Sequence, residues 1–290
     1  MNFPHYFADA EATFDSAQFI LFGVPFEKTS SFRHGADKGP FEIRQASWNF
    51  ERFDLRTKIS FEDISVHDYG DLEVKKLTSK QVFTTTKIFT ASLLRQQKLP
   101  VALGGDHSIT PGIVTAFPKD IAVLSLDAHL DFREQYKNDP YNHACVIRRI
   151  ADHIDVRNIN LIGIRSAEKE EYDNAKKLGL RFTDAFTIRS QGLQKTIENT
   201  KKSLKERPIY LTLDIDVIDP AYAPGTSTPE PLGLTPEEVL EIIDAFSPHL
   251  VGFDVVEICP PYDHGQTAVL AARLVRSCIS GIWSAQKEVT

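Results

Sequence analysis

Cysteine is scarce in this sequence of 290 residues, which contains only Cys145, Cys259 and Cys278. They are widely spaced and odd in number, with no Cys-x-x-Cys pair, so the sequence does not predict a disulfide framework. An apolar run of the roughly 18 to 20 residues needed to cross a membrane is also missing. Residues 1–15 contain no basic stretch followed by an apolar one, as a secretory signal would. We therefore expect a cytoplasmic protein that does not enter a membrane.

Basic residues are outnumbered by acidic ones, 33 to 40, which gives a net charge of −7. An acidic balance argues against nonspecific nucleic-acid binding and leans towards a small cationic substrate. Internal repeats, biased tracts and linker-like segments are absent as well. Hydrophobic residues make up 42% of the chain, enough for a buried core. We interpret residues 1–290 as a single domain.

Short β-branched and aliphatic runs alternate with longer amphipathic segments. The runs are Phe19–Val24, Ile64–His67, Pro100–Leu103, Ile121–Leu126, Ile159–Ile164, Leu180–Thr183, Ile209–Leu213 and Leu250–Val256. Several are apolar throughout, which is typical of strands buried on both faces of a parallel sheet. Thr78 with Gln81 predicts a capped helix that runs to about Gln97, and Thr235 before Pro236 predicts another. The alternation indicates an α/β protein with a mostly parallel sheet between helices.

Polar side chains follow four of the predicted strands, at the point where each strand ends. They lie in Gly104–Ser108, Asp127–Asp131, Asp214–Asp216 and Val255–Glu257. In a parallel α/β sheet, ligands bind beyond the carboxyl ends of the strands. These four segments are therefore expected to form one site.

Spacing within the segments selects six candidate metal ligands: His107, Asp127, His129, Asp131, Asp214 and Asp216. Because an extended chain repeats every two residues, Asp127, His129 and Asp131 can point the same way. Four crowded aspartates would repel one another unless cations lay among them, and two divalent ions would balance their charge. Mostly oxygen ligands with some imidazole favour Mn²⁺, with Zn²⁺, Fe²⁺, Co²⁺ and Ni²⁺ left open. Two such ions that share a hydroxide indicate metal-assisted hydrolysis.

Each segment also has a plainer interpretation. A histidine after two glycines, such as His107, can cap a helix or lie in a core. Asp214 and Asp216 could be turn residues ahead of Asp219, which precedes a proline. We assign Asp219 to such a turn, and Asp106 to a supporting role beside the ligands. The combination of segments is what favours a metal centre.

Gly104–Ser108, Asp127–Asp131 and Asp214–Pro220 resemble the three metal-binding signatures of the ureohydrolases, the family of arginase, agmatinase, guanidinobutyrase and formiminoglutamase. The resemblance covers about residues 20–280. It implies a three-layer α/β/α sandwich around a mostly parallel eight-stranded sheet, in agreement with the eight runs above. It also implies a homo-oligomer, either a trimer or a hexamer. Departures from the family pattern include Ser227 and Leu232, which replace common glycines.

The resemblance also assigns roles, position by position. His107, Asp127, Asp131 and either Asp214 or Asp216 would be shared between two Mn²⁺ ions, with His129 on the second. His143 matches a mobile histidine that shuttles protons, Glu257 matches the carboxylate that holds the substrate guanidinium, and Thr228 matches a threonine of that pocket. Asp131 would orient the nucleophile, and either Asp131 or His143 would pass a proton to the leaving amine.

Two further stretches, Tyr141–Ala144 and Glu257–Asp263, resemble agmatinase within this family. The polar loop with which arginase reads an amino acid head group is missing. The expected reaction is the hydrolysis of agmatine to urea and putrescine, a step of polyamine biosynthesis. Glu168, Asp139 or Asp263 is expected to meet the distal ammonium group of the substrate.

Several alternatives remain open at this point. Arginase, guanidinobutyrase and guanidinopropionase share the same metal chemistry. A deacetylase-like hydrolase would use a single Zn²⁺, for which six ligands are too many. A non-catalytic member of the family would keep the metals without turnover.

Overall fold

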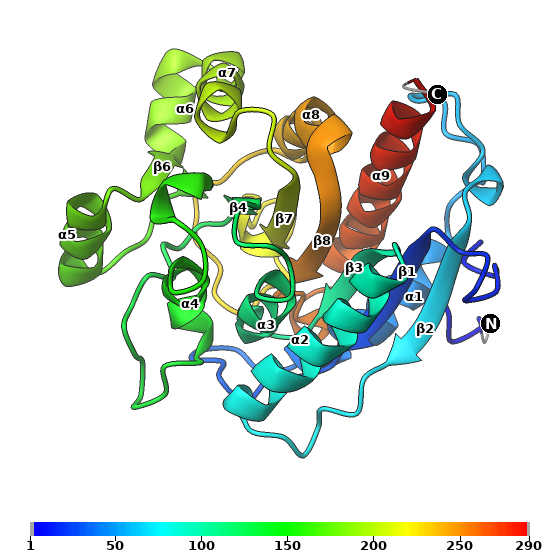
Figure 1. Cartoon of the computed structure of the whole chain (residues 1–290), viewed down its shortest axis with the longest axis horizontal. Coiled ribbons are helices and arrows are strands. Elements are labelled where there is room, and N and C mark those ends of the chain that lie inside the picture. Colours follow the sequence, from blue (N-terminus) through cyan, green and yellow to red (C-terminus); the bar gives the residue numbers. More distant parts are fainter. Residues whose placement is uncertain (1–2, 289–290) are drawn as a thin grey trace.

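One sheet of eight parallel strands forms the centre of the molecule (Figure 1). The computed structural model describes residues 3–288. The strands are β1 (Phe19–Val24), β2 (Val66–Asp71), β3 (Leu99–Gly104), β4 (Ala122–Leu126), β5 (Ile159–Ile164), β6 (Arg181–Asp184), β7 (Ile209–Asp214) and β8 (Leu250–Val256). Each predicted run corresponds to one strand, and the sheet is parallel throughout rather than mostly so. The largest difference in position is at β2, which begins at Val66 rather than at Ile64.

The inner strands of the sheet are buried on both faces, which explains why they are nearly continuous apolar runs, whereas the edge strands β2 and β6 are partly exposed. All six residues of β1 are buried. Phe19 and Leu21 contribute to the core on one face, whereas Ile20 and Phe22 contribute to the core on the other. Each face therefore needs a covering layer of helices.

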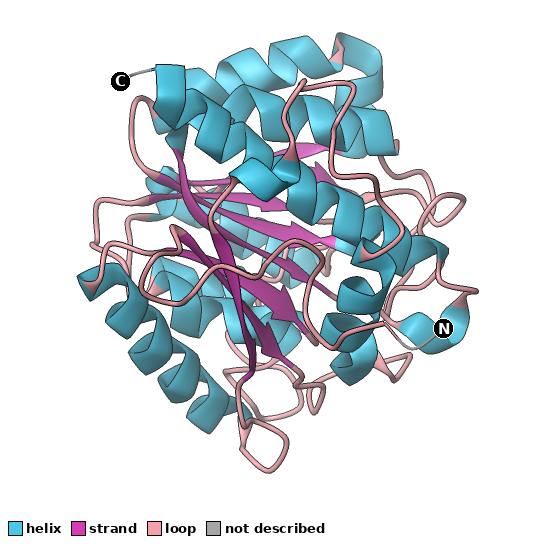
Figure 2. Ribbon diagram, turned by 90° about the vertical axis from the view of Figure 1, so that its right-hand side faces the viewer, coloured by secondary structure: helices cyan, strands magenta, loops and turns pink. Residues whose placement is uncertain are grey.

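Helices supply both layers (Figure 2). They are α1 (Gly39–Ser47), α2 (Ser79–Arg95), α3 (Thr110–Val114), α4 (Val146–Ala151), α5 (Lys169–Leu178), α6 (Ala185–Gln191), α7 (Leu193–Leu204), α8 (Pro236–Phe246) and α9 (Gln266–Glu288). Residues of α1 and α6 to α9 join the core that contains Phe19, and residues of α2 to α5 join the core that contains Ile20. The fold is the three-layer α/β/α sandwich expected from the sequence.

The two predicted helix starts are confirmed in atomic detail. Thr78 accepts a hydrogen bond from the backbone of Gln81 and so begins α2, which ends at Arg95. Thr235 forms the equivalent capping box with Glu238 at the start of α8. Such boxes satisfy backbone donors that have no partner inside the helix.

Helix α9 needs a qualification of the sequence analysis. By length and composition, Gln266–Lys287 is apolar enough to cross a membrane, although the sequence showed no uninterrupted apolar run of that length. However, 61% of the 18-residue apolar window in this helix is buried inside the fold, and Leu274 and Cys278 belong to the core beneath the sheet. Packing against the sheet thus accounts for its apolar composition.

The strand order explains how distant segments come together. The order is β2-β1-β3-β8-β7-β4-β5-β6, so β3, β8, β7 and β4 are consecutive neighbours. These are the four strands whose carboxyl ends carry the polar segments. Their side chains therefore meet at one edge in the middle of the sheet.

Candidate metal centre and active site

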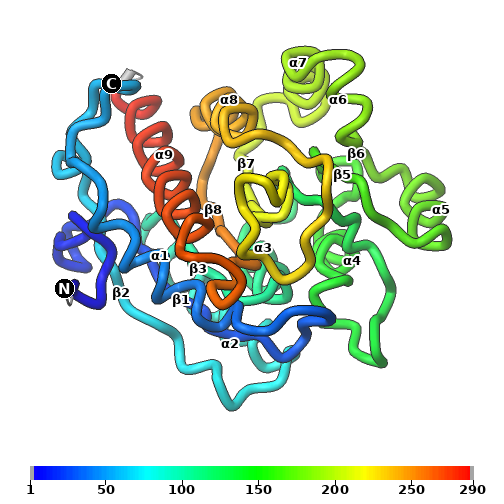
Figure 3. The backbone as a smooth tube through the Cα atoms, turned by 180° about the vertical axis from the view of Figure 1, so that it is seen from behind, coloured from blue at the N-terminus to red at the C-terminus, as the bar shows by residue number. Residues whose placement is uncertain are grey.

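Figure 3 shows β3, β8 and β7 side by side, with the yellow segment that follows β7 close to them. Beyond these strand ends, two groups of side chains have the geometry of metal sites. The first group is His107, Asp127 and Asp214, and the second is Asp127, His129 and Asp216. Within each group, one ligand atom per residue lies within 4.8 Å of the others. Asp127 is common to both groups and is therefore positioned to bridge two ions.

The first group converges on Nδ1 of His107. Oδ2 of Asp127 lies 3.2 Å from this atom, and Oδ2 of Asp214 lies 3.4 Å from it. Oδ2 of Asp131 is also 3.2 Å away, so Asp131 borders this group although it is not one of its three members. The structure thus brings all the predicted ligands of this half of the site together.

The second group converges on His129. Its Nδ1 lies 2.9 Å from Oδ2 of Asp216 and 3.7 Å from Oδ1 of Asp127. Asp214 belongs to the first group and Asp216 to the second, a division that the sequence left open.

The three grouped aspartates use their two oxygens differently. Oδ1 of Asp127 accepts from the N–H of His129 (2.6 Å), Oδ1 of Asp214 from that of Asp216 (2.9 Å), and Oδ1 of Asp216 from that of Ala128 (3.0 Å). The first two bonds fix each side chain against its own turn, whereas the third ties Asp216 to the segment that follows β4. Because β4 ends at Leu126 and β7 ends at Asp214, these backbone bonds rather than strand alternation aim the side chains at the strand ends.

His107 is oriented by residues that the sequence analysis did not identify. Oγ1 of Thr212 donates to Oδ1 of the buried Asp254 (2.6 Å), so it accepts a hydrogen bond from Nε2 of His107 (2.9 Å). With its hydrogen on Nε2, the imidazole turns the lone pair of Nδ1 towards the carboxylates. A partner that orients a ligand in this way is a regular feature of metal sites.

The donor set fits a pair of divalent cations. Nδ1 of His107 and Oδ2 of Asp127 are buried 3.2 Å apart, yet neither makes a hydrogen bond. Leaving buried polar atoms without a partner is costly. Burial, together with neighbouring carboxylates, raises the pKa of Asp131 to about 7 and that of Asp214 well above its usual range. Positive charge among these groups is therefore needed to keep them all ionised.

A cavity of about 240 Å³ opens onto these residues. Its walls include His129, Asp131, Asp214 and Asp216 together with His143, Thr228 and Glu257. The three residues that the resemblance assigns to the substrate thus share a cavity with metal ligands.

Glu257 is held rigidly at this cavity. Its Oε1 accepts a hydrogen bond from the N–H of His107 (2.7 Å), and its own N–H donates to the carbonyl of Gly105 (2.8 Å). Burial, with the charge of Asp106 added, raises the pKa of Glu257 to about 8. A bound cation beside Glu257 would stabilise its carboxylate, which makes it a suitable anchor for a guanidinium group.

His143 begins the short helical turn His143–Cys145 and lines the cavity. Burial lowers the pKa of His143 to about 4, so its imidazole is neutral at physiological pH. A neutral imidazole can accept a proton, which is what a proton shuttle requires.

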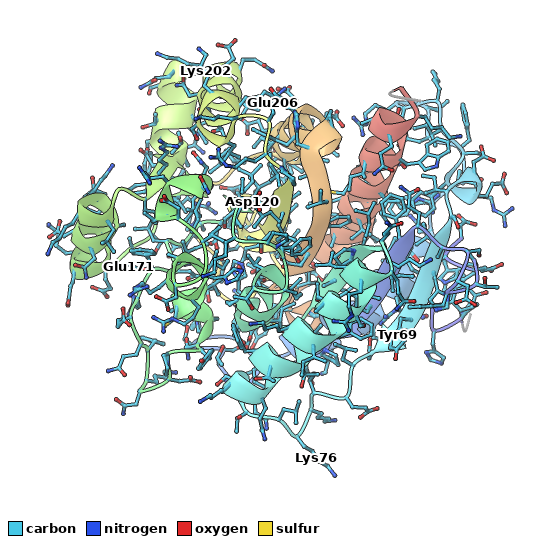
Figure 4. All side chains as sticks on the ribbon, viewed as in Figure 1. Tyr69, Lys76, Asp120, Glu171, Lys202 and Glu206 are labelled. Carbon is cyan, nitrogen blue, oxygen red and sulfur yellow. The ribbon has the colours of Figure 1, made fainter. Side chains whose placement is uncertain are left out.

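The outer wall contains residues that the sequence analysis missed. Arg133 stacks on the ring of Tyr136 with its guanidinium carbon 4.8 Å from the ring centre, and its Nε lies 3.6 Å from Oε2 of Glu171. Glu171 belongs to the first turn of α5 and is labelled in Figure 4. Glu230 also lines the cavity, with Oε1 3.7 Å from Nε2 of His129. Glu230 could have been identified from the sequence, because it lies two residues after Thr228, which was assigned to the pocket.

Of the three carboxylates expected at the far end of the substrate, Glu168 is the one that lines the cavity. Asp139 instead accepts hydrogen bonds from the Ser79 side chain and the Tyr141 backbone. Asp263 accepts from the backbone of Thr267 at the start of α9. Both are occupied by structural roles outside the cavity.

Known proteins resemble this chain over nearly its whole length. The model of the arginase family matches residues 17–281. An agmatinase of Bacillus anthracis is 34% identical over 282 residues, which cover 95% of each chain. A guanidinobutyrase of Pseudomonas aeruginosa is 33% identical over 95% of this chain and 89% of its own. The crystal structure of the agmatine ureohydrolase of Thermoplasma volcanium superposes with a TM-score of 0.95 at 38% identity, over 100% of this chain and 98% of the other. The protein is therefore a hydrolase of the arginase family.

Proposed function

We propose that this protein is an agmatinase, which hydrolyses agmatine to urea and putrescine with two Mn²⁺ ions per chain. The observation that carries the proposal is the single cavity in which Glu257, His143 and two carboxylate–imidazole groups meet. When bound, a pair of divalent ions supplies the Lewis acidity that makes hydroxide available from water at neutral pH. The oxygen-rich donor set favours Mn²⁺.

The chain's own residues would bind the guanidinium group and move protons. Glu257 would hold the N–H groups of the guanidinium, which sets its carbon against the nucleophile; such positioning is worth several kcal/mol. Asp131 would orient the hydroxide for its addition to this carbon. Asp131 would then hold the proton of that hydroxide. As the bond from this carbon to the alkyl nitrogen breaks, the proton held by Asp131 would pass to the leaving amine, either directly or through His143, whose neutral imidazole would take it up and hand it on.

The charge of the outer wall supports agmatine, which carries a second positive charge at its far end. Glu168, Glu171 and Glu230 line the cavity, against a single arginine, Arg133. Arg133 lies close to Glu168 and Glu171, which offset its charge. A distal ammonium group would therefore meet an excess of negative charge.

Arg133 also supports a second candidate, 4-guanidinobutyrate. Its guanidinium group borders the same cavity and could pair with a distal carboxylate if it left Glu168 and Glu171. The likeness to a guanidinobutyrase gives this substrate independent support. The three glutamates make it the weaker of the two candidates.

Assembly as a trimer or hexamer and a cytoplasmic location belong to the same proposal. They rest on the resemblance to the family and on the composition of the chain. Sedimentation of the purified protein would test the assembly, since a monomer would contradict it.

The test of the function is urea release by the purified protein loaded with Mn²⁺. Agmatine, arginine and 4-guanidinobutyrate are assayed side by side, and the metal content is measured on the same sample. We expect preferential turnover of agmatine and two ions per chain. Preference for 4-guanidinobutyrate would overturn the assignment of the outer wall, and a single Zn²⁺ per chain would overturn the binuclear centre. Two bound ions without urea from any substrate would support a non-catalytic member of the family.

A further inference from the structure

Thr29 lies between a buried carboxylate and the proposed proton shuttle. It belongs to the loop that follows β1 and is only 5% exposed. Its Oγ1 is 2.9 Å from Oδ2 of Asp106, 3.0 Å from the backbone nitrogen of His143 and 3.3 Å from Nδ1 of the His143 ring. Thr29 has no part in the mechanism proposed above.

The hydrogen of the Thr29 hydroxyl is directed to Asp106. Asp106 is fully buried and also accepts hydrogen bonds from the backbone of Thr29 and from the backbone and side chain of Ser108. Four donors around one carboxyl group require it to act as an acceptor throughout. Because a hydroxyl has one hydrogen and two lone pairs, Oγ1 of Thr29 has only acceptor capacity left for His143.

His143 fills that remaining capacity with two donors. Its backbone N–H takes one lone pair of Oγ1, and Nδ1 of its ring faces the other. Nδ1 can bond an acceptor only if it carries the hydrogen of the imidazole. Nε2 is then the unprotonated nitrogen, and no residue among 3–288 gives it a hydrogen bond.

We propose that Asp106 and Thr29 form a hydrogen-bond relay that fixes His143 as the tautomer with its hydrogen on Nδ1. This inference rests on the proposed function, in which Nε2 of His143 exchanges a proton with the reacting amine. Thr29 is then a positioning residue, which acts on catalysis through His143 alone. Proton uptake at Nε2 leaves the positive ring bonded through Thr29 to a buried carboxylate, which stabilises the charged form.

The surroundings of the ring agree with a fixed orientation. Tyr136 meets the His143 ring edge to face, with ring centres 6.1 Å apart. Asn142 accepts a hydrogen bond from the backbone of Ala144 and donates to the carbonyl of Thr29 (3.5 Å). The loop after β1 and the turn that carries His143 are therefore tied together at three points.

Two substitutions of Thr29 separate its hydroxyl from its shape. Thr29→Val keeps the shape and removes the acceptor, whereas Thr29→Ser keeps the acceptor. With agmatine we expect kcat to fall about 10- to 100-fold in the valine variant, within what a misplaced general acid or base costs. KM and the metal content should change less than about threefold, and the serine variant should stay within about threefold of the wild type.

Ser30→Ala is the matched control. Ser30 neighbours Thr29, and its hydroxyl is buried without a hydrogen-bond partner. Its loss should leave kcat unchanged. A valine variant as active as this control would overturn the proposal.

A double-mutant cycle with His143→Asn distinguishes the relay from a general structural role. If Thr29 acts through His143, adding Thr29→Val to His143→Asn lowers kcat no further. The proposal would be overturned if the double variant lost kcat by the product of the two single-variant factors.

The tautomer can also be measured without turnover, so an inactive wild type would refute the proposed function without hiding this result. Imidazole ¹⁵N shifts are recorded on protein labelled with ¹⁵N-histidine and loaded with diamagnetic Mg²⁺, and the His143 signals are assigned with His143→Asn. We expect the hydrogen on Nδ1 in the wild type and a mixture of tautomers in Thr29→Val. A hydrogen on Nε2 in the wild type would overturn the relay.

Discussion

Replacing Thr212 with valine tests how the metal centre is built, because valine keeps the shape of threonine but lacks its hydroxyl. That hydroxyl accepts from Nε2 of His107 and donates to Oδ1 of Asp254. Without it, nothing holds the hydrogen of His107 on Nε2 or the lone pair of Nδ1 towards Asp127 and Asp214. We expect the ion in the first group to bind more weakly.

The size of the effect follows from the two lost hydrogen bonds. Each leaves a buried group without its partner, at a cost of about 1–3 kcal/mol. Part of this cost is relieved when the ion reorients the ring. A net loss of 10- to 100-fold in metal affinity, or about 1.4–2.7 kcal/mol, is the range for a partner that orients a ligand.

The assay is a calorimetric titration of the metal-free protein with Mn²⁺. Thr212→Val should show one weakened site and one unchanged site, since His129 and Asp216 do not contact Thr212. Thr110→Val is the matched control, because Thr110 also donates to Asp254 (2.9 Å) but makes no bond to His107. Wild-type affinity at both sites in Thr212→Val, or an equal loss in Thr110→Val, would refute this account of His107.

Three further predictions concern other parts of the cavity. Glu257→Gln should keep two ions per chain and lose at least 100-fold in kcat/KM for agmatine; near-normal turnover would contradict the anchor. Asp127→Asn should lose both ions by elemental analysis, whereas Asp216→Asn should lose mainly one, because only Asp127 belongs to both groups. The pKa of His143 in the folded state is about 4, against an ordinary value of 6.5. The unfolded chain therefore binds more protons between these values, and stability falls as pH drops from 6.5 to 4. By chemical denaturation, the wild type should lose up to about 3 kcal/mol more over this window than His143→Asn; parallel curves would show that burial does not suppress this titration.

The overall layers could be predicted from the sequence because the six inner strands are buried on both faces, whereas the edge strands β2 and β6 are partly exposed. That burial makes the inner strands nearly continuous apolar runs, and the helix starts at Thr78 and Thr235 carry their own capping signals. The order of the strands within the sheet could not be predicted in this way. That β8 and β7 lie between β3 and β4 depends on long-range pairing, which no local pattern in one sequence specifies.

The residues behind the ligands were missed although they leave a signal. Thr212 and Asp254 are polar positions inside otherwise apolar strands, and β7 and β8 pair them directly opposite each other. A polar residue in a strand buried on both faces needs a partner. Two such residues in the sequence therefore already imply a buried hydrogen bond, but the bond between Thr212 and His107 becomes visible only in the fold.

The structure corrects the argument by which three of the metal ligands were predicted. Alternation along an extended chain was the argument for Asp127, His129 and Asp131, yet these residues follow the end of β4. Asp131 has φ of +48° and Glu257 has φ of +65°, so both lie in the left-handed region, which costs a non-glycine residue roughly 1–2 kcal/mol. Such a conformation persists only where neighbours hold it, as Gly105 and His107 hold Glu257. The same backbone that departs from the regular pattern is what turns these carboxylates into the cavity. A rule based on regular strands can therefore find the residues of this site, but it cannot predict how they are aimed.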